Sequence, residues 1–166
     1  MFIRVKKIKG NKYAYLVENK LKKGKIQQKV LSYLGKVCYF EKLKNNEFLE
    51  YNSIQNIDNY IKRSKEDIIK DLIEFEMVRH GFKKNKNFLA NKDVSFDLSK
   101  TWFEEKKVLA INEGFLCNYG IERLLNLKLK GEDEEKGLML AKAFVESGIN
   151  VPKEIFVEIF HKFNNQ

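Results

Sequence analysis

The stretch KGNKYAYLVENKLKKGKIQQKVLSYLGK, residues 9–36, decides how the N-terminal part of the chain folds. Just before it, FIRVKK (2–7) alternates apolar and basic residues, as a half-buried strand does. A turn is predicted at Gly10-Asn11. The alternation then continues in KYAYLVE (12–18) and KIQQKVLSYLG (25–35), with NKLKKG (19–24) as the loop between them. The sequence therefore predicts a three-stranded antiparallel sheet with one basic face.

This N-terminal segment, the head, also holds all of the excess positive charge. Residues 1–37 contain eleven Lys and Arg against one acid, Glu18, whereas the rest of the chain is close to neutral. A solvated sheet face is the plain alternative, but a neutral body with a head of charge +10 indicates a localised anionic partner. Lysines neutralise phosphates, and tyrosine rings stack on unpaired bases. The candidate nucleic-acid-binding residues are Arg4, Lys6, Lys7, Lys12, Tyr13, Tyr15, Lys20, Lys22, Lys23, Lys25, Gln27 and Lys29.

The remaining residues, 38–166, predict a mixed α+β body. Isoleucines at helical spacing predict a helix over 54–61, and a second helix is expected between Ser64 and Gly81. VSFDL (94–98) and KVLAI (107–111) predict strands of a second small sheet. Apolar stripes predict helices over 121–129, 132–147 and 152–163, the last two as an αα-hairpin. The predicted fold class is α+β, with a basic three-stranded β module over 1–37 and an α+β body over 38–166.

Within the head, Leu16-Val17-Glu18 ends an aromatic strand, and Gly24-Lys25, Gln28-Lys29-Val30 and Leu34-Gly35 follow. These residues resemble the N-terminal segment of a group of insertion-sequence transposases. In that segment, an aromatic strand ending in Leu-Val-Glu precedes Gly-Lys-x-Arg-Gln-Lys/Arg-Val and a closing Leu-Gly. Gln27 stands where a basic residue is usual. The resemblance covers about 36 of the 166 residues and implies nucleic-acid engagement, not chemistry.

The sequence predicts no catalytic residue, no metal ligand and no cofactor. Transposases of this kind cut DNA with three carboxylates that hold two metal ions. The acids around the predicted second sheet show no such spacing and are expected to be solvated: Asp93, Asp97, Glu104, Glu105 and Glu113. The acidic run GEDEEKG (131–137) precedes a helix and is expected to cap it. Cys38 and Cys117 are expected to be separate buried thiols.

The predicted function is non-catalytic nucleic-acid binding through the head, with DNA favoured because of the transposase-like segment. An RNA- or ribosome-associated factor is the nearest alternative, because phosphate contacts do not distinguish the two nucleic acids. Two further hypotheses are an adaptor, or homodimer, that uses the phenylalanine-rich C-terminal helices, and a nuclease that depends on Asp93 or Asp97. No apolar run has the length of a membrane span or of a signal peptide, which predicts a cytoplasmic protein without a membrane partner.

Overall fold

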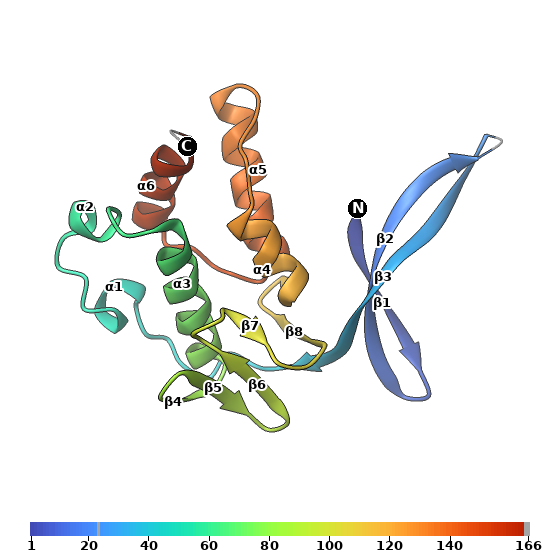
Figure 1. Ribbon diagram of the computed structural model, residues 1–166, viewed down its shortest axis with the longest axis horizontal. Helices are drawn as coiled ribbons and strands as arrows, with labels where there is room; N and C mark the ends of the chain where they lie inside the picture. The colour runs from blue at the N-terminus through green and yellow to red at the C-terminus, as the bar shows by residue number, and fades with distance from the viewer. Residues whose placement is uncertain (23, 165–166) are drawn as a thin grey trace.

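The computed structural model describes residues 1–22 and 24–164, and these form two β-sheets and six α-helices. The α+β fold class is confirmed. In Figure 1 the helices gather on one side of the molecule, while the first three strands stand apart on the other. Among the described helices, none has the length and apolar character needed to cross a membrane.

The larger sheet has five strands in the order β1-β2-β3-β8-β9. Their bounds are β1 Phe2–Ile8, β2 Asn11–Lys22, β3 Lys25–Tyr39, β8 Lys107–Ile111 and β9 Gly114–Leu116. The predicted antiparallel arrangement of the first three strands is confirmed. The predicted loop over 19–24 is wrong at residues 19–22, which continue β2. Across the hairpin these residues pair with residues 25–28, and these pairs extend the ladder beyond Glu18.

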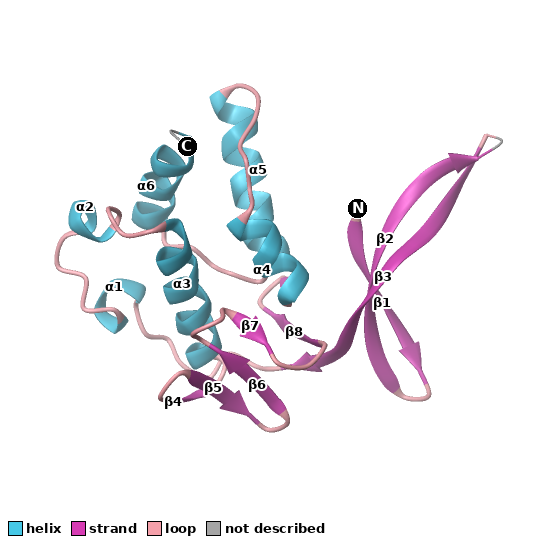
Figure 2. Cartoon of the chain, viewed as in Figure 1, coloured by secondary structure: helices cyan, strands magenta, loops and turns pink. Residues whose placement is uncertain are grey.

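The fourth strand of this sheet corrects a second expectation. KVLAI, which is β8, lies in the larger sheet and not in the second one, because it pairs in parallel with the end of β3, from Lys36 to Tyr39. Val37 and Val108 are opposite each other and both are buried. β3 therefore runs past residue 37 and joins the head to the body as one continuous sheet (Figure 2).

The second sheet has four antiparallel strands in the order β4-β5-β6-β7. They are β4 Lys83–Asn85, β5 Phe88–Asn91, β6 Val94–Asp97 and β7 Trp102–Phe103. The predicted strand VSFDL is β6. Its Phe96 is fully buried and packs edge-on against Phe103 of β7, with ring centroids 4.8 Å apart.

The helices are α1 Phe48–Tyr51, α2 Ile57–Tyr60, α3 Lys65–Arg79, α4 Asn118–Leu125, α5 Asp133–Glu146 and α6 Lys153–Asn164. Two expected helices are shorter than predicted: 54–61 forms only the single turn of α2, and 121–129 ends at Leu125. The C-terminal pair is present. The acidic run caps α5 as expected, and it does so through a capping box formed by Glu132 and Glu135.

The main core surrounds α3, whose residues Ile68, Ile69, Leu72 and Ile73 are fully buried. One cluster of hydrogen-bonded polar side chains lies inside it. The fully buried Glu76 accepts hydrogen bonds from Arg79 Nη1 at 2.9 Å, from Asn112 Nδ2 at 3.1 Å and from the backbone N–H of Asn150 at 3.3 Å. This carboxylate thus ties the end of α3 to two distant loops.

Candidate nucleic-acid interface

The β2–β3 hairpin extends beyond the rest of the sheet. β1 begins at Phe2, opposite Val17, so the five residue pairs from Glu18/Lys29 to Lys22/Lys25 have no third strand beside them. We call residues 18–22 and 25–29 the arm. Figure 1 shows the arm as a twisted two-stranded ribbon that points away from the body. A two-stranded ribbon with no third strand beside it exposes side chains on both of its faces.

Register assigns each side chain of the head to one of two faces, because residues directly opposite each other in an antiparallel pair point the same way and neighbours alternate. The tyrosine face is formed by Phe2, Arg4, Lys6, Tyr13, Tyr15, Val17, Asn19, Leu21, Ile26, Gln28, Val30, Tyr33 and Lys36. The lysine face is formed by Ile3, Val5, Lys7, Lys12, Ala14, Leu16, Glu18, Lys20, Lys22, Lys25, Gln27, Lys29, Ser32 and Gly35. The expectation of one basic face is therefore wrong, since the basic residues divide between the two.

The tyrosine face brings three phenol rings together at its base. Tyr33 packs between Tyr13 and Tyr15, with ring centroids 6.3 Å and 5.5 Å away, and is 40% exposed. The ammonium of Lys6 lies 5.4 Å from the ring centre of Tyr15, and that of Lys106 lies 6.0 Å from the ring centre of Tyr33. These distances are within cation–π range, so the cluster is an aromatic surface edged with positive charge.

The Tyr33 hydroxyl stays neutral in this setting. Partial burial raises its pKa, and the adjacent Tyr13 and Tyr15 raise it further. A neutral phenol donates a hydrogen bond without repelling a phosphate. Above the cluster, Arg4 hydrogen-bonds through Nη1 to the side-chain oxygen of Gln28, which connects the base of the face to the arm.

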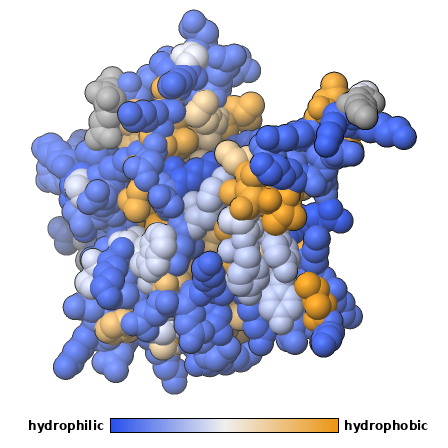
Figure 3. All heavy atoms as spheres, turned by 45° about the vertical axis from the view of Figure 1, so that its right-hand side comes forward, coloured by the Kyte–Doolittle hydropathy of each residue, from blue (hydrophilic) through white to orange (hydrophobic). Residues whose placement is uncertain are grey.

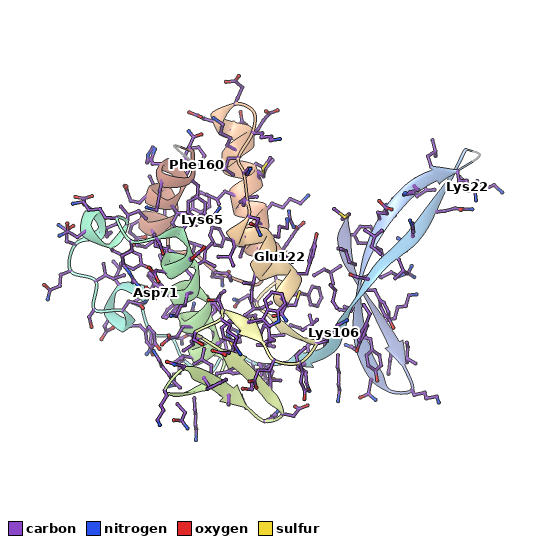
Figure 4. All side chains as sticks on the ribbon, viewed as in Figure 1. Lys22, Lys65, Asp71, Lys106, Glu122 and Phe160 are labelled. Atoms are coloured by element: carbon purple, nitrogen blue, oxygen red, sulfur yellow. The ribbon has the colours of Figure 1, made fainter. Side chains whose placement is uncertain are left out.

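The lysine face changes character along the hairpin. Near the body it is apolar, and Ile3, Val5 and Ala14 pack into a small cluster around Val108. In the arm it is basic, with Lys20, Lys22, Lys25 and Lys29 exposed beside Gln27. Among the described residues of the head, one lysine has a carboxylate partner: Lys20, whose Nζ lies 3.1 Å from Glu18. Figure 4 shows Lys22 near the tip of the arm, far from the acidic side chains of the helices.

The other predicted residues lie nearer the body. Lys7 and Lys12 are exposed at the opposite end of the ladder from the arm, and Lys12 Nζ donates a 3.0 Å hydrogen bond to Tyr39. Lys23 lies outside the described residues.

The structure adds three residues that the sequence interpretation missed, namely Tyr33, Lys36 and Lys106. Two irregularities in the β2–β3 ladder, which leave Leu31 and Leu34 without partners, place Tyr33 beside Tyr15, and simple alternation does not predict such shifts.

The acidic residues around the second sheet lie in different surroundings. Asp97 is buried, contrary to the expectation of solvation. Hydrogen bonds replace the lost water: its Oδ1 accepts from the hydroxyl and from the backbone N–H of Ser99, at 2.6 Å and 2.8 Å. These bonds hold the pKa of Asp97 below its ordinary value of 3.8. Asp93 is exposed and pairs with Lys107 at 2.7 Å. In the described part of the chain, no three His, Cys, Asp or Glu side chains converge as metal ligands.

The two cysteines are separate thiols. Cys117 is fully buried, as expected, whereas Cys38 is only half-buried. Burial raises the pKa of both thiols, which lowers their nucleophilicity at neutral pH.

Comparison of the chain with protein-family models, with curated proteins and with solved structures finds no match.

Proposed function

We propose that the chain is a non-catalytic nucleic-acid-binding protein, with DNA favoured, and that the head grips the phosphate backbone. The observation that carries this proposal is the arm. Its exposed lysines lie on a ribbon that extends clear of the body, and only Lys20 is paired with a carboxylate among those described.

The energetics of such a surface favour a polyanion. An exposed lysine that has no carboxylate partner loses no ion pair when a phosphate approaches it. Each phosphate that it neutralises releases condensed counterions, which is the main source of sequence-independent affinity for DNA. The helices and the second sheet are close to neutral and add no competing field, so positive potential is concentrated at one end of the molecule.

The tyrosine face supports a second kind of contact with the same partner. Tyr33 is exposed, Tyr13 and Tyr15 flank it, and Lys6 and Lys106 supply charge at the edges. Unpaired bases stack on such rings with little regard to sequence. This feature also fits RNA, which stays the alternative partner. DNA is favoured by the resemblance of the head to the transposase segment.

The test is fluorescence anisotropy with a labelled duplex of about 20 base pairs, titrated at several salt concentrations. If about five lysines or arginines contact phosphate, log Kd should change with log salt with a slope of magnitude roughly 4 to 5. The triple variant Lys22→Glu, Lys25→Glu, Lys29→Glu should reduce that magnitude by about 3 and weaken binding to all sequences alike.

The matched control is Lys128→Glu, Lys130→Glu, Lys153→Glu. These three lysines are exposed on the body, so the control changes the net charge by the same amount and leaves the arm intact. It should bind almost as the unmodified chain does. Affinity that ignores salt, or equal weakening by the two triple variants, would contradict the proposal. Parallel titrations with duplex and single-stranded RNA decide between the two nucleic acids.

A further inference from the structure

The tyrosine face continues along the arm as a second surface with a different composition. Beyond the aromatic cluster it presents Val30, then the opposed amides Asn19 and Gln28, then the opposed aliphatic pair Leu21 and Ile26. Leu21 is 76% exposed and Ile26 72%. Figure 3 shows hydrophobic atoms, in orange, near the tip of the arm among hydrophilic ones. In the arm the described lysines all lie on the opposite face.

The dimensions of the arm match one groove of a nucleic acid. Five residue pairs extend about 13 Å at ~3.3 Å per residue, and the two strands lie ~4.8 Å apart. The major groove of B-form DNA is about 12 Å wide and 8.5 Å deep and admits a two-stranded ribbon. The undistorted minor groove, at about 6 Å, admits a ribbon only when the DNA is bent or widened, and the major groove of A-form RNA is too deep and narrow for side chains to read.

The side chains also match the chemistry at the floor of that groove. An Asn or Gln amide forms two hydrogen bonds with adenine, accepting from N6 and donating to N7, and aliphatic side chains contact the thymine methyl group. Asn19 is exposed. The oxygen of Gln28 already accepts from Arg4, but a carbonyl oxygen has a second lone pair for adenine N6.

The lysines complete the arrangement from the other side. Lys20, Lys22, Lys25 and Lys29 have long, flexible stems, so their ammonium groups reach past the ribbon edges to the phosphates that border the groove. Charge on the back of the ribbon and neutral amide and aliphatic groups on the front separate phosphate contact from base contact. An apolar protein groove would leave Lys22, Lys25 and Lys29 without an anionic partner.

We infer that the arm enters the major groove of duplex DNA and reads A·T base pairs with Asn19 and Gln28, while Leu21 and Ile26 contact thymine methyl groups. This inference rests on the proposed function and adds a sequence preference and a groove to it.

The first measurement is an in vitro selection from duplexes with a random core of ten base pairs, using the full chain. The unmodified chain should enrich A·T pairs at defined positions. The double variant Asn19→Ala, Gln28→Ala should lose that enrichment while keeping its salt-dependent affinity for unselected DNA. The expected loss on the selected duplex is at least roughly 5- to 150-fold, which is the range for one good bidentate contact.

The second measurement alters the DNA and leaves the protein intact. In the selected duplex, 7-deazaadenine removes the N7 acceptor and uracil in place of thymine removes the methyl group, both in the major groove alone. Each replacement should weaken binding, and the uracil effect should disappear in Leu21→Ala, Ile26→Ala.

Three results would overturn the inference. The first is that the Asn19→Ala, Gln28→Ala variant still enriches A·T pairs, and the second is that neither base replacement changes the affinity. The third is that Leu21→Ala, Ile26→Ala binds DNA normally and loses only binding to phosphatidylglycerol vesicles. If no DNA is bound in a salt-dependent way, the proposed function itself fails, and that result precedes any selection.

Discussion

Replacing Gly35 by alanine should destabilise the protein more than any other single methyl group added to the head. Gly35 lies in β3 where the head meets the body, with φ +146°, a backbone conformation that other residues rarely adopt. A Cβ at this position would lie 2.2 Å from the carbonyl oxygen of Lys106 and 2.9 Å from the backbone nitrogen of Lys107. Both neighbours are backbone atoms, so neither can move aside as a side chain would.

Two costs add in this variant. The unusual backbone conformation costs about 1–3 kcal/mol for a residue with a Cβ, and forcing a methyl group into packed backbone costs about 1–3 kcal/mol more. The free energy of unfolding should therefore fall by about 4 kcal/mol. For a chain of this length that corresponds to a decrease in Tm of roughly 8–16 °C.

The assay is urea unfolding followed by far-ultraviolet circular dichroism at 25 °C, with Gly10→Ala as the control. Gly10 also has a positive φ, +84°, but a Cβ there meets no atom within 4 Å, so this variant carries only the conformational cost of about 1–2 kcal/mol. Equal losses in the two variants would refute the steric argument and show that the β3–β8 junction relaxes without difficulty.

Three further results are expected. Glu76→Ala should cost about 3–5 kcal/mol in urea unfolding, because it leaves the largely buried Arg79 guanidinium without its counter-charge. The stability of the unmodified chain should decline as the pH falls through and below 3.8. The hydrogen bonds from Ser99 lower the folded-state pKa of Asp97, so as the pH falls the unfolded chain binds the proton before the folded chain does. The contribution of Asp97 to the free energy of unfolding is therefore present above pH 3.8 and is lost below it. Tyr33→Ala should weaken binding of a single-stranded oligonucleotide about tenfold in anisotropy titrations, because it removes one stacking surface.

Each of these expectations has a matched comparison. Glu104→Ala, at an exposed acid, should leave stability almost unchanged. The stability difference between Asp97→Asn and the unmodified chain should shrink as the pH falls below 3.8, and a constant difference would contradict the assignment to Asp97. Tyr39→Ala removes an exposed tyrosine from the same strand but outside the aromatic cluster, and a loss as large as that of Tyr33→Ala would exclude stacking on the cluster.

Local pattern was enough to predict the strands of the head. Ile3 and Val5 alternate with basic residues, and Tyr13, Tyr15 and Val17 share a face, as the structure confirms. The capping box at Glu132 was also predictable, because helix capping depends on residues within one turn.

Features set by distant partners were not predictable. Nothing within NKLKKG shows that residues 19–22 extend β2, since Lys and Asn have weak strand propensity and their pairing comes from the opposite strand. The parallel partnership of β8 with β3 joins residues about 70 positions apart. The two irregularities in the β2–β3 ladder place Tyr33 opposite Tyr15. Sequence periodicity does not predict where a strand register shifts in this way.

The continuity of β3 has a mechanical consequence. One strand of 15 residues runs from the tip of the hairpin into the sheet that supports the helices. A hydrogen-bonded strand is far stiffer along its length than a peptide linker. A force applied at the tip of the hairpin is therefore transmitted to the helical half and is not absorbed by a flexible linker. A molecule bound to the helical half would be held at a fixed distance and angle from a molecule bound at the tip.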